Sequence, residues 1–240
     1  MDNTGYTTLN RQVGLLKEMQ SVANNIANVS TTGYRKERVV FAEFVQHLDG
    51  EEASLSMADA AGRGVNLMQG PLTQTKGTFD FAIEGDGFFM VETPEGQLLT
   101  RAGIFTPSEE GLLVNIDGNP LLDLGGAPIP VPLDAQKIDL ANDGTLSADG
   151  VELAQVGVFV PADINQMTRA GSTGFAVDGD ILPMDEPVVL QGFLENSNVS
   201  PINEIARMIQ VQRAYEMGQT FLNNEDERMR NAIQALASKA

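Results

Sequence analysis

The chain has 240 residues, of which 42% are hydrophobic, and it contains no cysteine. This composition is sufficient for a folded core and excludes disulfides and thiolate metal sites. The formal charge of −18 is concentrated in residues 49–200, with 24 acidic and five basic side chains, whereas residues 1–48 carry four and five and residues 201–240 carry five of each. A centre of this charge repels phosphates, which argues against nucleic acid or anionic lipid as the partner.

The first 33 residues have the apolar spacing of a long amphipathic helix. Leu15, Met19, Val22, Ile26 and Val29 recur at steps of four and three, and Leu9, Val13, Leu16 and Ala23 form a neighbouring stripe. The helix is predicted to end at Thr31-Thr32-Gly33, because glycine accepts the left-handed conformation that follows a helix. This start lacks the basic and apolar regions of a cleaved secretory signal, so we expect none.

Residues 34–71 are interpreted as a linker or extended arm. Val39-Val40-Phe41 and Phe44-Val45 resemble a short strand or a helix extension, and residues 49–64 are small, acidic and rich in glycine. His47, the single histidine, lies here without a nucleophile motif, and we interpret it as a solvated or partner-facing residue. No catalytic constellation is found elsewhere, so the chain is not predicted to be an enzyme.

Residues 72–199 change to the period of β-strands. Phe79, Phe81 and Ile83 alternate with polar or small residues, and ten of the eleven prolines lie between residues 71 and 187. Asp-Gly pairs, which favour tight hairpin turns, occur at residues 86–87, 117–118, 143–144, 149–150 and 178–179. The pattern predicts an antiparallel β domain. The same acidic pairs leave a calcium- or glycan-binding module as an alternative, although no complete calcium loop is present.

Residues 200–240 predict a second and longer helix. Ser200 is a capping residue, Pro201 suits the first helical position, and Glu204 suits the positive end of the helix dipole. Met208, Tyr215, Leu222, Met229 and Leu236 are seven residues apart, as in a coiled-coil seam. A helix of about 36 residues spans about 55 Å, so it overhangs a single small domain and part of the seam requires another chain. The carboxylates at residues 225–227 are expected to pair with arginines of neighbouring helices.

These elements predict an α+β fold in which the long terminal helices pair as an antiparallel coiled-coil stalk carrying a central antiparallel all-β domain. The expected divisions are residues 1–33 with 200–240, a linker at 34–71, and residues 72–199. No cofactor or metal site is predicted. The residues expected at an assembly interface are Leu9, Val13, Leu16, Met19, Val22, Ile26, Val29, Ile205, Met208, Ile209, Tyr215, Leu222, Met229, Ile233 and Leu236.

Four motifs, in this order, resemble the bacterial flagellar rod and hook protein family. They are Asn24–Lys36 (NNIANVSTTGYRK), Phe81–Phe89 (FAIEGDGFF), Thr100–Phe105 (TRAGIF), and Leu194–Pro201 (LENSNVSP) followed by Glu204 and Met208–Glu216. The resemblance spans nearly the whole chain. It implies a structural subunit of the basal-body rod, the drive shaft that transmits torque from motor to hook, with terminal helices forming an inner tube and the β domain an outer face.

The resemblance also implies partners and a location. The expected partners are other flagellar rod proteins, copies of the chain itself and the flagellar type III export apparatus, with neither nucleic acid nor membrane insertion. The expected location is the rod where it crosses the periplasm, reached without a cleaved signal. The compact middle favours a proximal-rod member, with a distal-rod member as the alternative.

Overall fold

A computed structural model of the chain describes residues 3–46 and 55–237, which fold into two compact units. The first unit comprises residues 1–27, 36–66 and 200–240, and the second comprises residues 28–35 and 67–199. His47 and the acidic tip of the expected linker lie outside the described residues. Among the helices within the described ranges, none has the length and apolar character needed to cross a membrane.

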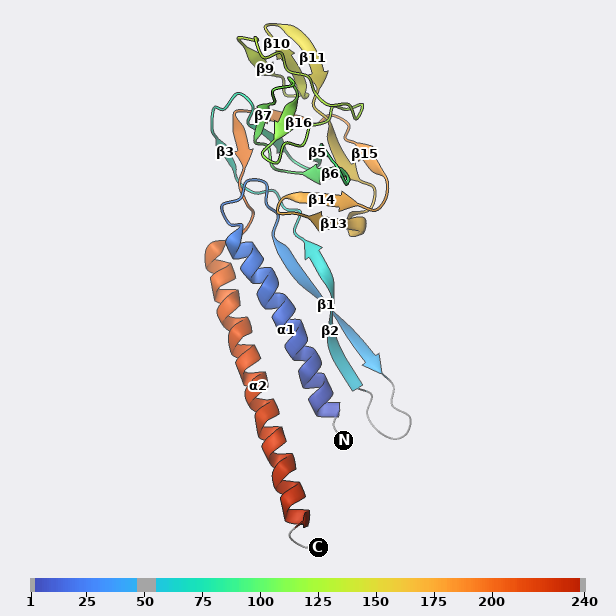
Figure 1. Cartoon of the computed structure of the whole chain (residues 1–240), viewed down its shortest axis with the longest axis vertical. Helices are drawn as coiled ribbons and strands as arrows, with labels where there is room; N and C mark the ends of the chain where they lie inside the picture. Colours follow the sequence, from blue (N-terminus) through green and yellow to red (C-terminus); the bar gives the residue numbers. More distant parts are fainter. Residues whose placement is uncertain (1–2, 47–54, 238–240) are drawn as a thin grey trace. The chain divides into compact units, whose positions relative to one another are not determined.

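Two long helices dominate the first unit, α1 (Asn3–Ala27) and α2 (Pro201–Ala237). The carbonyl of Ser200 accepts a 3.0 Å hydrogen bond from the amide of Glu204, so α2 begins where its proline is tolerated. Figure 1 shows the two helices side by side, with α2 continuing past the N-terminal end of α1. Both terminal helices that the sequence predicts are therefore present.

A two-stranded antiparallel ribbon also belongs to the first unit. It consists of β1 (Glu37–Gln46) and β2 (Leu55–Val65), paired from Glu37 opposite Val65 to Gln46 opposite Leu55. The ribbon lies along α1 (Figure 1). The interpretation of residues 34–71 as a linker or extended arm did not include this pairing. The small residues and glycines of β2 have low β propensity, so the sequence does not identify it as a strand.

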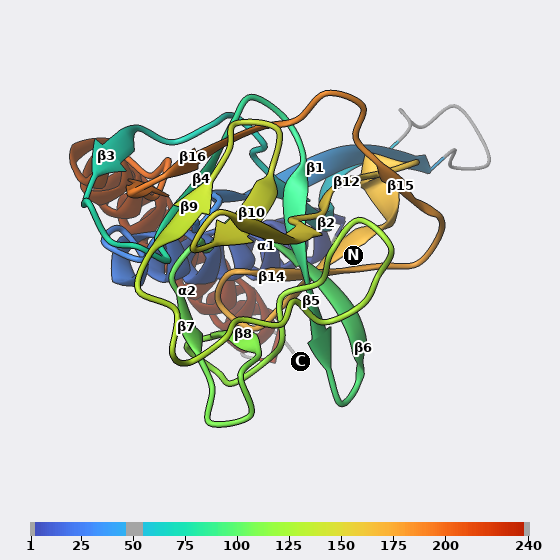
Figure 2. The same cartoon turned by 90° about the horizontal axis from the view of Figure 1, so that it is seen from above.

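The largest sheet of the second unit has six antiparallel strands in the order β13-β14-β6-β5-β12-β15. Its strands are β5 (Phe88–Thr93), β6 (Gly96–Thr100), β12 (Val158–Pro161), β13 (Met167–Ala170), β14 (Gly174–Val177) and β15 (Ile181–Pro183). A 3-10 turn at Ile164–Gln166 precedes β13. Figure 2 shows β5 and β6 as neighbouring strands joined by a short turn.

Shorter strands complete the second unit. One three-stranded sheet contains β9 (Ile138–Leu140), β10 (Thr145–Ala148) and β11 (Val151–Gln155). The remaining antiparallel pairs are β3 (Leu72–Gln74) with β17 (Phe193–Glu195), β4 (Phe81–Glu84) with β16 (Val188–Gln191), and β7 (Phe105–Pro107) with β8 (Leu113–Asn115). The central part of the chain is thus β-rich and antiparallel, which confirms the α+β class.

The Asp-Gly pairs form turns for the predicted reason. Asp149 and Gly150 both have positive φ, 49° and 83°, and they join β10 to β11 as a two-residue hairpin. The glycines at residues 87, 118 and 144 also have positive φ, whereas Gly179 does not. The second unit has an apolar core in which the ring of Phe105 contacts those of Phe81 and Phe89, at centroid distances of 5.8 and 5.6 Å.

The structure divides the chain differently from the expected boundaries at residues 33 and 71, whereas its division after residue 199 is the expected one. Helix α1 ends at Ala27 rather than near Gly33, so Val29 is not helical. Asn28 accepts hydrogen bonds at its carbonyl from the Thr31 amide and at its side chain from the Thr31 hydroxyl, and this local turn competes with another helical turn. Residues 28–35 consequently join the second unit, and residues 36–66 join the first.

Candidate assembly surface

The contact between α1 and α2 begins at a buried polar cluster. The Glu204 carboxylate, whose residue is 2% exposed, accepts a 3.0 Å hydrogen bond from the Asn25 side-chain amide and forms an ion pair with Lys36. Asn25 also bonds the backbone of Glu37 in both directions, at 2.8 and 2.9 Å. One asparagine thereby links α1 to the first residue of β1 and to the first turn of α2.

Two further polar contacts follow along the helices. Arg207 donates a 2.6 Å hydrogen bond from Nε to Glu18, and Gln12 donates a 2.9 Å bond to the carbonyl of Tyr215. From one contact to the next, the residue number rises on α2 and falls on α1. Gly218 of α2 lies directly beside the Gln12 side chain. A Cβ at residue 218 would lie only 2.1 Å from the Gln12 amide nitrogen. The single glycine of α2 therefore lets a side chain of α1 come close to the α2 backbone.

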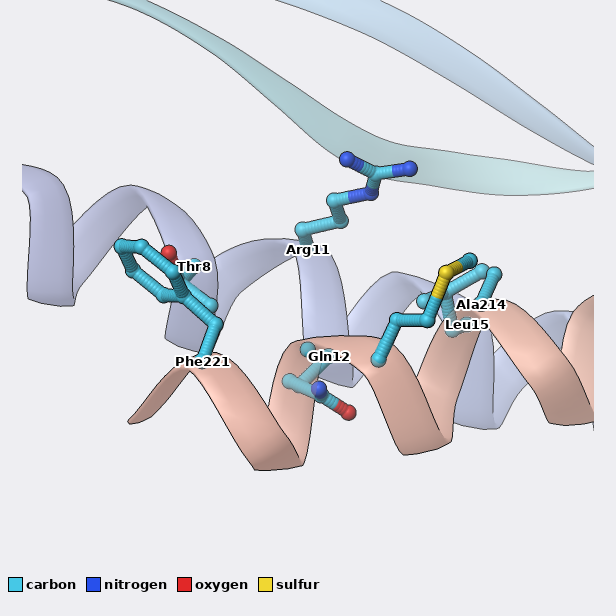
Figure 3. Close-up of a pocket in the computed structure, with 8 residues that line it drawn as sticks. Thr8, Arg11, Gln12, Leu15, Ala214 and Phe221 are labelled. Carbon is cyan, nitrogen blue, oxygen red and sulfur yellow. The ribbon is translucent and has the colours of Figure 1, made fainter. Parts of the chain in front are cut away.

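An open groove of about 350 Å³ lies between the helices next to this contact (Figure 3). Its lining consists of Thr8, Arg11, Gln12, Leu15, Ala214, Met217, Gly218 and Phe221. In Figure 3, Phe221 lies beside Thr8, and Arg11 points away from α2. The groove is apolar in its lining apart from the threonine, the glutamine and this arginine, so it suits an apolar side chain better than a charged ligand.

The residues expected at the interface divide into three groups by exposure. Val22 is buried. Six are half-buried, namely Met19, Ile26, Val29, Met208, Tyr215 and Leu222. Eight are exposed, namely Leu9, Val13, Leu16, Ile205, Ile209, Met229, Ile233 and Leu236. The structure thus brings together the members near the centre of the α1–α2 contact and leaves the remainder uncovered.

The exposed apolar residues form separate stripes on the two helices. On α1, Leu9, Val13 and Leu16 share one face, whereas the buried Ser21 and Asn25 lie on another. On α2, Ile205 and Ile209 lie near its beginning, on a face turned away from the buried Val211. Contiguous exposed apolar patches of this kind mark protein–protein contact sites.

Several participants escape a sequence search for apolar stripes. The buried Val211 falls between Met208 and Tyr215 at helical spacing, and the exposed Ile202, Met217 and Phe221 extend the apolar surface. Asn25 and Glu204 are polar, so apolar spacing does not find them, and they stand out in the sequence only because they belong to the quoted family motifs. The acidic run at residues 225–227 differs from expectation, because Glu225 pairs with Arg228 and Asp226 with Arg230 on the same helix.

The second unit contains a separate buried charge cluster built from the same motifs. Glu195, 1% exposed, forms ion pairs with Arg35 and Arg101, both at 3.0 Å, and accepts a 2.9 Å hydrogen bond from the Gly70 amide. Arg101 also donates to the carbonyl of Gly85 at 2.6 Å. Burial lowers the pKa of Arg101 to about 10, opposed by the attraction of Glu195, so the guanidinium remains charged at neutral pH.

The backbone around this cluster requires a glycine. The amide of Gly33 donates a 2.7 Å hydrogen bond to the carbonyl of Glu195, with φ at 72°. A Cβ at Gly33 would lie 2.3 Å from the backbone of Arg101 and Ala102. The predicted left-handed conformation of Gly33 is confirmed, but it serves a close backbone approach inside the second unit and not a helix end.

The surface of the second unit is strongly acidic. Residues 28–35 and 67–199 contain 20 acidic and five basic side chains. Of the basic residues, Arg35 and Arg101 are buried with Glu195, and Arg169 stacks on Tyr34 and Phe175. Lys76 and Lys137 remain as exposed cations. Within the described ranges, no group of three His, Cys, Asp or Glu side chains is placed to hold a metal ion.

Comparison with protein families gives three matches along the chain. Residues 3–35 match the flagella basal body rod protein family, residues 82–148 the flagellar hook protein FlgE/F/G D1 domain, and residues 190–235 the flagellar basal body rod FlgEFG protein C-terminal family. Apart from Lys36 and Phe81, these three ranges contain the four motifs on which the sequence resemblance rests.

Individual relatives extend the similarity over the full length. The flagellar basal-body rod protein FlgF of Caulobacter vibrioides is 37% identical over 98% of both chains, and that of Mesorhizobium japonicum is 32% identical over 100% of both. The flagellar basal-body rod protein FlgG of Bacillus subtilis is 29% identical over 95% of this chain and 97% of its own length. Similarity therefore covers both units.

Proposed function

The chain belongs to the flagellar basal-body rod protein family, in which FlgF members are among its relatives, and we propose that it polymerises through the exposed faces of its two terminal helices. It is a structural subunit of the rod and not an enzyme. The relatives favour this function over a calcium- or glycan-binding module.

The observation that carries the proposal is the uncovered apolar surface of the first unit. Eight of the fifteen residues expected at the interface are exposed, although the helices already contact each other. We propose that α1 and α2 form an antiparallel coiled-coil stalk. Its support is the order of the contacts from Asn25–Glu204 through Glu18–Arg207 to Gln12–Tyr215. Contacts made by different patches on each copy would generate a helical array without closure.

The acidic second unit fits an outward, water-facing position in this proposal. Its like charges would oppose burial of one such surface against another, whereas the near-neutral terminal segments carry no comparable penalty. Similarity to FlgF supports a proximal place in the rod, with a distal place as the alternative. Export through the flagellar type III apparatus and a position across the periplasm are proposed from family membership alone.

Substitution of an exposed helix residue tests the proposal without disturbing the monomer core. Leu16 is 42% exposed on α1, so Leu16→Asp should leave monomer stability within about 0.5 kcal/mol of the parent. In an assembled rod, the buried and unpaired carboxylate would cost several kcal/mol. We expect loss of rod incorporation and of motility when this variant replaces the parent chain in a flagellated host.

Leu124→Asp is the matched control, because Leu124 is 43% exposed in the second unit. It introduces the same chemistry at the same exposure and should support normal motility. Rod fractions analysed by immunoblot would separate failed incorporation from failed expression. Motile cells with Leu16→Asp in their rods would refute the proposed helical interface.

A further inference from the structure

We infer that the end of α2 binds α1 of a second copy, an inference that rests on the proposed function and specifies one of its contacts. The overhang is defined as residues 225–237 of α2, with Met229, Ile233 and Leu236 as its apolar stripe. The outer stripe is defined as Leu9, Val13 and Leu16 on α1. Each copy carries both surfaces, so the contact would repeat from copy to copy.

The overhang continues the row of α2 that contacts α1. Glu204 and Val211 are buried on this row, and Tyr215 and Leu222 are half-buried. Beyond them Met229 is 38% exposed and Leu236 is 73% exposed. The side chains keep the same helical face, so their exposure rises because the partner helix ends and not because the stripe rotates away.

The contacts within the chain locate that end. Gln12 is level with Tyr215, and Glu18 is level with Arg207. With the same rise in both helices, Asn3, where α1 begins, is level with about residue 224. The overhang therefore has no helical partner among the described residues of its own chain.

The outer stripe is available because α1 has a third face. One face holds Gln12 and Leu15 beside α2, and a second holds Ser21 and Asn25, of which Asn25 bonds both β1 and Glu204 of α2. Leu9, Val13 and Leu16 lie on the remaining face. Along α2 the row that ends in the overhang packs against α1, so another α1 offers the most similar surface.

The length and spacing of the two stripes favour this pairing. Both stripes have steps of four and three residues and span about 10.5 Å. The alternative site for the overhang is the isoleucine stripe near the beginning of α2, formed by Ile202, Ile205 and Ile209.

The pairing predicts the axial spacing of the two copies. Ile233 lies 18 residues beyond Tyr215, which is level with Gln12. At 1.5 Å per residue, the second copy is displaced by about 27 Å along the helix axis. The same separation prevents Val13 and Ile233 of one chain from meeting, since a disulfide requires Cβ atoms about 4 Å apart.

Cysteine cross-linking tests the contact directly, because the parent chain contains no cysteine. Val13→Cys and Ile233→Cys would be expressed together as separate full-length chains, one carrying a larger tag, and rods would be isolated and oxidised with copper phenanthroline. We expect a mixed disulfide joining the two tags. Gln234→Cys replaces Ile233→Cys as the matched control, because residue 234 points about 100° away on the same helical turn. Its yield should be at least fivefold lower.

The outcomes separate this inference from the proposed function. Incorporated variants without the 13–233 cross-link, or with efficient cross-linking from 233 to an Ile205→Cys partner instead, would overturn the inference and leave helical polymerisation intact. A rod that incorporates Leu16→Asp would contradict the proposed function itself. The double variant Val13→Cys with Ile233→Cys should form no internal disulfide in dilute monomer, and one that forms it would also overturn the inference.

Discussion

Replacing Glu195 with glutamine should destabilise the second unit more than any comparable surface change. Glu195 is the carboxylate between Arg35 and Arg101, all three residues being at most 3% exposed. Glu195→Gln removes the negative charge while keeping the side-chain volume, so the two buried guanidinium groups lose their main counter-charge and keep only the weaker attraction of Asp86. Removing one partner of a buried ion pair costs about 3–5 kcal/mol. The shape of the site contributes little to this loss.

Thermal and urea unfolding of the full-length chain would measure the effect. Tyr34, buried in the second unit, provides a near-ultraviolet circular dichroism signal for that unit. For a unit of this size, a loss of about 4 kcal/mol lowers the melting temperature by about 8–16 °C. Glu152→Gln, at an exposed position of β11, is the charge-matched control and should shift stability by less than about 0.5 kcal/mol.

The triple variant Arg35→Met, Glu195→Leu, Arg101→Met distinguishes an uncompensated charge from lost packing. An apolar replacement of a buried ionic cluster is often neutral or stabilising, so this variant should be more stable than Glu195→Gln alone. A cost below about 1 kcal/mol for Glu195→Gln would refute the reasoning, because it would mean that the cluster is solvated or that the arginines find other partners.

Two further substitutions test the close contacts of the quoted motifs. Asn25→Ala should destabilise the first unit by about 3 kcal/mol, because the buried Glu37 amide loses its acceptor and the buried Glu204 carboxylate loses a donor. Urea unfolding would measure this loss, with Asn223→Ala at an exposed position of α2 as the control. Gly33→Ala should destabilise the second unit by at least about 2 kcal/mol, because its Cβ meets backbone at 2.3 Å and its φ is 72°; unchanged melting would show that the segment moves without cost.

Local patterns were sufficient to predict both terminal helices and the turns between strands. Helical spacing and Pro201 predicted α2, and its start at that residue is confirmed. Asp149-Gly150 predicted a hairpin turn because both residues tolerate positive φ, and the turn is present. Family motifs predicted the rod protein family, which the relatives show. In each case the information lies within a few neighbouring residues, where steric and hydrogen-bonding preferences act directly.

Patterns also left part of the candidate surface undetermined. Periodicity placed Leu222 and Leu236 on one row, but only the start of α1 at Asn3 explains why the first is half-buried and the second exposed. The pairing of β1 with β2 depends on cross-strand partners that are distant in the sequence, and the small residues of β2 give little strand signal of their own. Stripe counting ignores Asn25 and Glu204, since both are polar, although both lie in the buried contact.

The sequence by itself determined two long amphipathic helices, a β-rich acidic centre and membership of a rod protein family, because periodicity, turn residues and local motifs are properties of short segments. Tertiary structure alone decided which parts of the apolar rows are covered, that residues 28–35 belong with the second unit, and that Glu195 and Glu204 are buried with cationic partners. Those features depend on residues separated by up to 203 positions, as for Gln12 and Tyr215, whose proximity no local preference encodes.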